Sequence, residues 1–110
     1  MIEIDPGQLR HRLALQSPTK GQDAYGAPTQ TAWTTYATVW GEVIPVSASE
    51  KMAAEIVNPL VTHSMTIRRR SGVQADHRIL YNGRTFQIDG IYDMEEEREY
   101  QRIETIERIA

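Results

Sequence analysis

The sequence contains no cysteine among its 110 residues. A disulfide framework, a thiolate metal site and a cysteine nucleophile are therefore excluded. Positive charge is not in excess either, because 12 lysines and arginines face 15 aspartates and glutamates, for a net charge of −3. A protein that binds DNA by coating itself in positive charge has the opposite balance, so this class is disfavoured.

Long apolar runs are also missing. No window approaches the roughly 20 apolar residues that a membrane-spanning helix needs. The first seven residues lack the basic start and apolar run of a signal peptide. We therefore expect a soluble protein that makes no membrane contact. The length is typical of one domain, so we expect residues 1–110 to form a single domain.

Motifs that carry chemistry are absent from the sequence. It has no histidine pair at helical spacing, no glycine-rich phosphate loop and no Gly-x-Ser-x-Gly turn. His11, His63 and His77 lie in or beside expected strands, where a histidine bonded within a sheet is the ordinary case. We predict no enzyme, no cofactor and no metal site. A site that the fold assembles from a histidine and a carboxylate is the remote alternative.

Alternation of polar and apolar residues predicts mainly β structure. It predicts one strand over residues 11–16 and another over residues 61–69. Residues 31–47 are rich in Thr, Val, Trp and Tyr and carry apolar residues on both faces, which predicts a strand buried on both sides for part of its length. Gly41 within it is expected to mark a bulge or a bend.

The strongest local signal is Asn82-Gly83, which is typical of a type I′ hairpin turn. A two-residue turn there places Ile79 opposite Phe86, within a hairpin that spans residues 78–89. Asp89-Gly90 is expected to form a further turn or kink. Residues 100–109 fit both a helical and a strand period, with β-branched content slightly favouring a strand.

Two segments interrupt the strands. Residues 17–30 hold two prolines and two glycines and are expected to form a long loop. Residues 49–58 begin with a helix-capping serine and end at Asn58-Pro59, which predicts one short helix. Together these patterns predict a mainly all-β fold, a small single-domain β-barrel of about six strands with a long loop and one short helical insert.

Charge is unevenly distributed along the chain. Residues 51–90 carry a net charge of +3, with Arg68-Arg69-Arg70 at the end of the expected central strand, whereas residues 91–110 carry −4. A basic and an acidic segment can neutralise each other within one fold, meet across a subunit boundary, or simply form solvated faces. With no catalytic motif present, an interaction or assembly protein is the natural inference.

The order of short motifs resembles the tailed-phage head-closure family, also called head–tail joining, adaptor or stopper proteins. The resemblance covers residues 7 to 93. It rests on the opening segment 9–18, the Asp-Ala-Tyr-Gly turn at 23–26, Trp33, Val-Trp-Gly-Glu-Val at 39–43, Pro45, Ser47 and Glu50, Thr-Ile-Arg at 66–68, Gly72-Val73, and the hairpin at 78–88.

The resemblance implies a small β-barrel that forms a ring below the portal of a tailed phage or prophage. Such a ring closes the DNA-filled head, retains the genome and provides the tail docking surface, without catalysis. Its implied partners are portal or adaptor ring proteins, tail proteins and other copies of itself. DNA passes through its channel without sequence-specific binding. The implied location is the head–tail interface of the virion, and the host cytoplasm during assembly.

Three groups of residues are candidates for this role. A subunit or partner contact is expected between the arginine run and the acidic run of a neighbour, a channel gate in the long loop, and a portal- or tail-facing surface on the helix. The residues are Arg68, Arg69, Arg70, Glu95, Glu96, Glu97 and Glu99 for the contact; Thr19, Lys20, Gly21, Gln22 and Asp23 for the gate; and Glu50, Lys51 and Glu55 for the helix.

Two other functions compete with head closure. A tail-completion or tail-terminator-like ring protein shares the assembly class but binds a different ring. A nucleic-acid-binding domain with an OB-like barrel is less favoured, because it needs aromatic residues interleaved with basic ones on one face.

Overall fold

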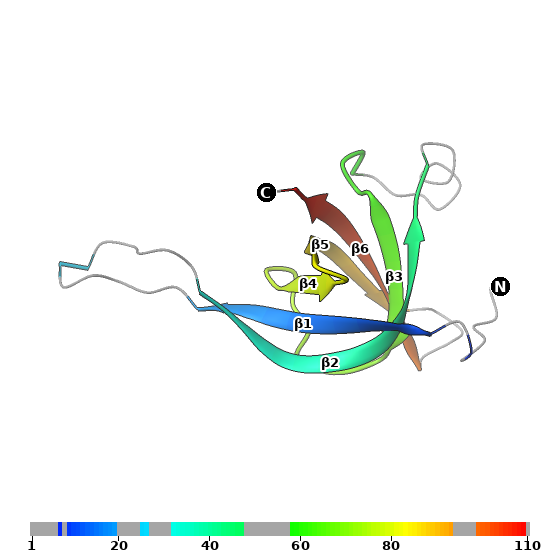
Figure 1. The fold of residues 1–110 in the computed structure, drawn as a ribbon, viewed down its shortest axis with the longest axis horizontal. Coiled ribbons are helices and arrows are strands. Elements are labelled where there is room, and N and C mark those ends of the chain that lie inside the picture. Colours follow the sequence, from blue (N-terminus) through cyan, green and yellow to red (C-terminus); the bar gives the residue numbers. More distant parts are fainter. Residues whose placement is uncertain are drawn as a thin grey trace.

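Alternating side chains along six strands build a closed antiparallel barrel in the computed structural model (Figure 1). The structure describes residues 7, 9–19, 25–26, 32–47, 58–93 and 99–109. The all-β prediction and the expected number of strands are both confirmed. The strands are β1 (His11–Thr19), β2 (Ala32–Pro45), β3 (His63–Arg68), β4 (Arg78–Tyr81), β5 (Arg84–Asp93) and β6 (Tyr100–Arg108).

The strand order around the barrel is β1-β2-β3-β6-β5-β4, and β4 closes the circle by pairing with β1. Closure gives every strand two neighbours, so no strand is a sheet edge along its whole length. Two strands that are three steps apart in a circle of six lie on opposite sides. β2 and β5 are such a pair.

The barrel is filled by apolar residues that alternate along each strand. Those of β1, β3 and β6 face inward at every second position, as the period of two requires. All are buried, so the core needs no second layer of structure. The buried cluster is Leu13, Leu15, Met65, Ile67, Ile79, Phe86, Ile88 and Ile103.

β2 serves two neighbours in turn and changes partner at Gly41. Residues 32–41 pair with β1, and residues 41–45 pair with β3, so Gly41 faces both His11 and Ile67. A Cβ atom at Gly41 would lie 2.5 Å from a Leu13 methyl carbon and 3.0 Å from the carbonyl oxygen of Thr66. Only glycine fits where the two strands approach so closely, and the predicted bend corresponds to this change of partner.

The prediction that β2 is buried on both faces is wrong. Its inner residues Ala37, Val39 and Val43 pack against the core. On the outer face, Trp40 is 53% exposed and Ile44 is 43% exposed. The barrel is a single layer, so an outward-facing apolar side chain on β2 has no second sheet to cover it.

The hairpin and the C-terminal segment form as their patterns indicate. Asn82 and Gly83 both have positive φ, 52° and 74°, as a type I′ turn requires. Ile79 pairs with Phe86, which confirms the predicted register. The pairing of β5 with β6 shifts between Ile88 and Gly90, so the expected kink is a β-bulge. The ambiguous C-terminal segment is strand β6, held between β3 and β5.

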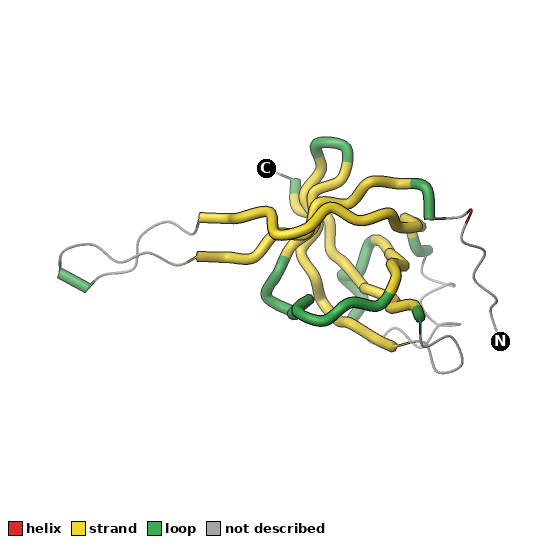
Figure 2. Tube along the Cα trace, turned by 90° about the horizontal axis from the view of Figure 1, so that it is seen from below, coloured by secondary structure: helices red, strands yellow, loops and turns green. Residues whose placement is uncertain are grey.

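The long loop begins later than predicted. Ser17, Pro18 and Thr19 continue β1 and pair with Thr34, Trp33 and Ala32 of β2. These pairs lie beyond the last contact of β1 with β4, so this end of β1 and β2 projects from the barrel as a two-stranded arm (Figures 1 and 2). Pro18 is tolerated there because the arm has free edges. The predicted helix spans residues 49–58, of which residues 49–57 lie outside the described part of the chain.

Replacing Gly41 by alanine is expected to destabilise the barrel by about 1–3 kcal/mol, as overpacking of a filled core does. The added methyl group must push Leu13 aside and still meets the Thr66 backbone. Urea unfolding measures the change, with Thr38→Ala on the exposed face of β2 as the control. A loss below about 0.5 kcal/mol at Gly41 would contradict the close approach described above.

Candidate interaction surfaces

The three consecutive arginines point in three directions. Arg69 forms an ion pair with Asp93 at the end of β5, with 3.3 Å between the charged atoms, and its backbone N–H donates to the Glu99 carbonyl oxygen over 2.7 Å. Both partners belong to the same chain. Arg69 is therefore neutralised within the fold, which is one of the three arrangements that the charge pattern left open.

Arg70 and Arg68 have no carboxylate partner among the described residues. Arg70 turns back toward the barrel, where its guanidinium lies 5.8 Å from the centre of the Tyr36 ring and its backbone N–H donates to the Gln101 side chain. Arg68 is exposed and its guanidinium lies 5.8 Å from the Tyr100 ring centre. Of the three, Arg68 is the one whose charge faces solvent without a counter-charge in that part of the chain.

The acidic run is only partly described. Glu99 is exposed and precedes β6, whereas residues 95–97 lie outside the described residues. The two ends of the run, Asp93 and Glu99, both lie beside Arg69. The structure therefore brings the basic and acidic segments to the same end of the barrel, and the predicted contact between subunits stays a prediction.

The other two candidate groups lie almost wholly beyond the described part of the chain. Of the expected gate, Thr19 is the last residue of β1 rather than a loop residue, and residues 20–23 are outside. The helix candidates Glu50, Lys51 and Glu55 are outside as well. What the structure adds is the root of the gate segment, which starts from the tip of the β1–β2 arm.

The root of the arm is held by a polar network on the barrel surface. The Arg78 Nε donates to the Gln16 side-chain oxygen over 2.7 Å, and the Gln16 amide donates to the Thr35 hydroxyl over 2.9 Å. The same guanidinium stacks 4.3 Å from the centre of the Trp33 ring. β4 thereby fixes the direction in which β1 and β2 leave the barrel.

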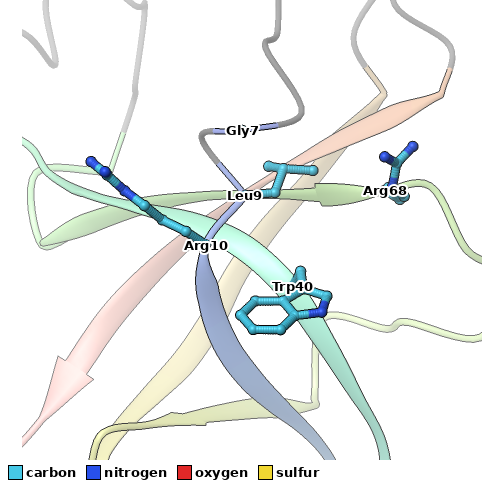
Figure 3. Close-up of a pocket in the computed structure, with 5 residues that line it drawn as sticks. All are labelled: Gly7, Leu9, Arg10, Trp40 and Arg68. Atoms are coloured by element: carbon cyan, nitrogen blue, oxygen red, sulfur yellow. The ribbon is translucent and has the colours of Figure 1, made fainter.

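A pocket of about 330 Å³ lies at the opposite end of β1 and β2 and was not predicted from the sequence (Figure 3). Its described lining residues are Gly7, Leu9, Arg10, Trp40 and Arg68. Arg12 pairs with Trp40 across the two strands and holds its guanidinium 4.5 Å from the indole centre. The signal was present in the Leu-Arg-His-Arg and Val-Trp segments. Only the strand register could show that they meet.

The three histidines are bonded within the sheet, as predicted. His11 Nδ1 lies 2.9 Å from the Tyr81 hydroxyl, and His77 Nδ1 lies 2.8 Å from the Tyr36 hydroxyl. His63 Nδ1 lies 2.9 Å from the Thr62 hydroxyl. Within the described residues, no three histidine or acidic side chains are grouped closely enough to hold a metal ion.

An ion pair closes the end of the barrel away from the pocket. Arg84 donates through Nε and Nη2 to the two carboxylate oxygens of Glu107, over 2.8 Å and 2.7 Å. This hydrogen bonding lowers the pKa of Glu107. Burial, and then the nearby Arg84 charge, lower the pKa of His63. Arg84 is therefore paired with Glu107 and lies apart from the arginines at the pocket end.

Glu104 is a buried carboxylate on β6. It is 3% exposed, and its oxygen lies 3.4 Å from an Arg102 nitrogen. Burial raises the pKa of Glu104, and the partial compensation from Arg102 does not cancel that effect. The hydrogen bond from Tyr92 also works against the rise. Burial thus disfavours the charged form of Glu104.

Comparison with known proteins decides which class of protein these surfaces belong to. The family of phage head completion proteins matches residues 4–108 of the chain. The chain is a phage head completion protein by family. This confirms the family resemblance seen in the motif series. The family is one of structural phage proteins rather than of enzymes, so the chain has a structural role at the phage head and its tail junction and is associated with the virion.

Two solved structures share the fold of this head completion family member. Protein SF1141 from Shigella flexneri 2a, solved in solution, superposes with a TM-score of 0.77 at 25% identity, over 94% of this chain and 96% of that one. A chain of the virion of a native gene transfer agent particle superposes with a TM-score of 0.65 at 21% identity, over 93% and 97%. No curated protein matches the chain.

In this head completion family member, no helix among the described residues is long and apolar enough to cross a membrane. What the described surface presents instead is an arm at one end of the β1–β2 ladder and an arginine–tryptophan pocket at the other. A structural protein acts through such surfaces, because its function is the set of contacts that it makes.

Glu104→Gln is expected to raise the free energy of unfolding, relative to the unchanged chain, more at pH 7 than at pH 4.5. A carboxyl with a raised native pKa is disfavoured in its charged form. The unchanged chain therefore gains stability as pH falls through that pKa toward the ordinary value, and glutamine removes this gain. Urea unfolding at several pH values measures the difference. A difference that grows as pH falls would contradict the stated cause of the shift.

Proposed function

We propose that this chain is a head–tail connector subunit that assembles as a ring below the portal of a tailed phage or prophage. The ring closes the DNA-filled head, retains the genome and offers the docking surface for the tail. Membership of the head completion family over nearly the whole chain is the observation that carries the proposal. A closed barrel with no exposed full-length edge supports it, because such a subunit can pack beside copies of itself without strand aggregation.

Portal or adaptor ring proteins, tail proteins and other copies of the chain are the proposed partners. We assign the subunit contact to Arg68, Arg69 and Arg70 against Glu95, Glu96, Glu97 and Glu99 of a neighbour. Support comes from Arg68, which has no carboxylate partner among the described residues. Arg69 already forms an ion pair with Asp93 of its own chain, so it adds no unpaired charge to the proposed contact.

The proposed channel gate is the segment from Thr19 to Asp23. Thr19 ends β1 on the projecting arm, so the proposed gate segment begins beyond the last contact of β1 with β4. DNA is proposed to pass this gate without sequence-specific binding. The net charge of −3 gives the chain little general attraction for the phosphate backbone. The residues Glu50, Lys51 and Glu55 are proposed to face the portal or the tail. The proposed location of the protein is the head–tail interface of the virion, and the host cytoplasm during assembly.

Analytical ultracentrifugation with and without the cognate portal ring tests the proposal. We expect the protein to join the portal as a ring and to shift its sedimentation, and Glu50→Ala, Lys51→Ala and Glu55→Ala together to weaken that attachment or the later attachment of tails. A portal that sediments unchanged would instead favour a tail-completion or tail-terminator-like ring. Steeply salt-dependent binding of single-stranded DNA by the protein alone would favour a nucleic-acid-binding barrel.

A deletion of residues 19–22 distinguishes the proposed gating function from ring formation. The deletion removes one pair of the arm, Thr19 with Ala32, and none of the pairs that close the barrel. Ring formation on the portal is therefore expected to persist while filled heads lose their DNA. Nuclease-sensitive DNA released from purified heads is the measurement. Heads that keep their DNA with the shortened segment would show that the gate lies elsewhere.

A further inference from the structure

Two stacks of an arginine on a tryptophan lie on the outer surface of the barrel, where β1, β2 and β4 pair. Arg12 lies opposite Trp40 in the register of β1 on β2 and holds its guanidinium 4.5 Å from the indole centre. Arg78 of β4 holds its guanidinium 4.3 Å from the centre of the Trp33 ring. Each stack joins residues distant in the sequence, so the pairing of the strands creates an arrangement that local patterns do not show.

The register of the strands places both stacks on the same side. Leu13 points into the core, so Arg12 before it points outward, and Gln16 does so by the same alternation. Gln16 pairs with Arg78 on β4. Arg12 and Gln16 are four residues apart on one strand, which corresponds to about 13 Å. We call this surface the stacked-arginine face, formed by Arg12, Trp33, Trp40 and Arg78.

The stacked-arginine face is basic although the chain as a whole is acidic. β1 and β4 contain no acidic residue, and β2 contains Glu42 alone. Two further exposed arginines, Arg10 and Arg68, border the end of the face at Trp40 (Figure 3). Within the part of the chain that the structure describes, neither stacked arginine forms an ion pair with a carboxylate. The net charge of −3 therefore does not describe this face.

Both stacked arginines are held in place before a ligand binds. A guanidinium that lies on an indole keeps its N–H donors at the edge of its plane, where they can reach phosphate oxygens. Arg78 is fixed further, because its Nε donates to Gln16. Since each indole already carries a guanidinium, the face offers charge more than bare rings, and so it fits phosphates better than unstacked bases. Two like units at a fixed spacing also fit a ligand whose charge repeats, as the charge of a nucleic-acid backbone does.

We propose that the stacked-arginine face binds the phosphate backbone of double-stranded DNA, independently of sequence. A duplex keeps its bases stacked inside and presents a regular row of phosphates, which is the chemistry that this face fits. The inference deepens the proposed connector function and rests on it for the DNA that the subunit meets. A single subunit binds weakly, because it contributes few arginines, and its binding falls steeply with salt.

The full chain and a labelled duplex oligonucleotide of mixed sequence provide the test, with fluorescence anisotropy at several salt concentrations as the measurement. Arg12→Gln is the main variant, because Arg12 is exposed. We expect it to weaken binding at low salt about fivefold and to reduce the salt slope by about 1, since one phosphate contact is lost. The matched control is Arg108→Gln, which removes an exposed arginine from β6, the strand three steps from β1 in the circle. We expect the control to change the affinity by less than about twofold.

The second stack is tested with Arg78→Gln, for which the same loss of affinity and of salt slope is expected. Arg78 also holds Gln16 at the root of the arm. Urea unfolding of each variant therefore distinguishes a loss of binding from a loss of folding. Arg12→Gln decides the inference if Arg78→Gln fails to fold.

Four results would overturn the inference. The first is no binding of the duplex by the unchanged chain at low salt. The second is an equal loss of affinity in Arg12→Gln and Arg108→Gln, because the protein would then respond only to net charge. The third is tighter binding of the separated single strand than of the duplex, which would assign the face to unstacked bases. The fourth is a polyglutamate peptide that binds more tightly than the duplex, which would make the face a docking site for an acidic protein.

The inference and the proposed function can fail independently. A protein that joins the portal ring, and whose duplex affinity is unchanged by Arg12→Gln, overturns the inference and leaves the connector role standing. A loss of duplex affinity in Arg12→Gln but not in Arg108→Gln, together with a portal that sediments unchanged, supports the inference and removes the connector role.

Discussion

The change of partner at Gly41 is the constraint on which the rest of the structure depends. β2 is the longest strand, and it can pair with β1 along one half and β3 along the other only if both neighbours approach the same residue. That approach leaves no room for a Cβ atom. Closure of the barrel and burial of Leu13 and Ile67 against the glycine both depend on this single crossing point.

Local patterns were sufficient for the strands, because each inward residue repeats with a period of two and the core is one cluster. Asn82-Gly83 predicted its turn and the register of β4 on β5, since both positions require positive φ. Side-chain contacts between residues distant in the sequence could not be predicted from local patterns. Arg12 and Trp40 meet only through the register of β1 on β2, so the pocket was invisible until the strands were paired. Trp40 was also misjudged, because an apolar residue on a single-layer barrel can face outward.

The charged residues illustrate the same limit. The three consecutive arginines were assigned to one subunit or partner contact, yet they contact Tyr100, Asp93 and Tyr36 of their own chain, respectively. Successive residues at the end of a strand leave in different directions, so sequence adjacency says little about which charges share a surface. Arg84, at the other end of the barrel, is fully engaged by Glu107. The electrostatic character of each end is set by tertiary pairing rather than by the distribution of charge along the chain.

The β1–β2 ladder connects the two ends of the molecule as one continuous element. It starts beside the pocket at His11 and Gly41 and finishes at Thr19 and Ala32, and nine residue pairs span it. At about 3.3 Å per residue this is a bar of roughly 30 Å. The Arg78 network and the pairing with β4 hold this ladder near its middle. The same ladder carries the core residues Leu13 and Leu15, so the packing of the core sets the direction of the arm relative to the pocket.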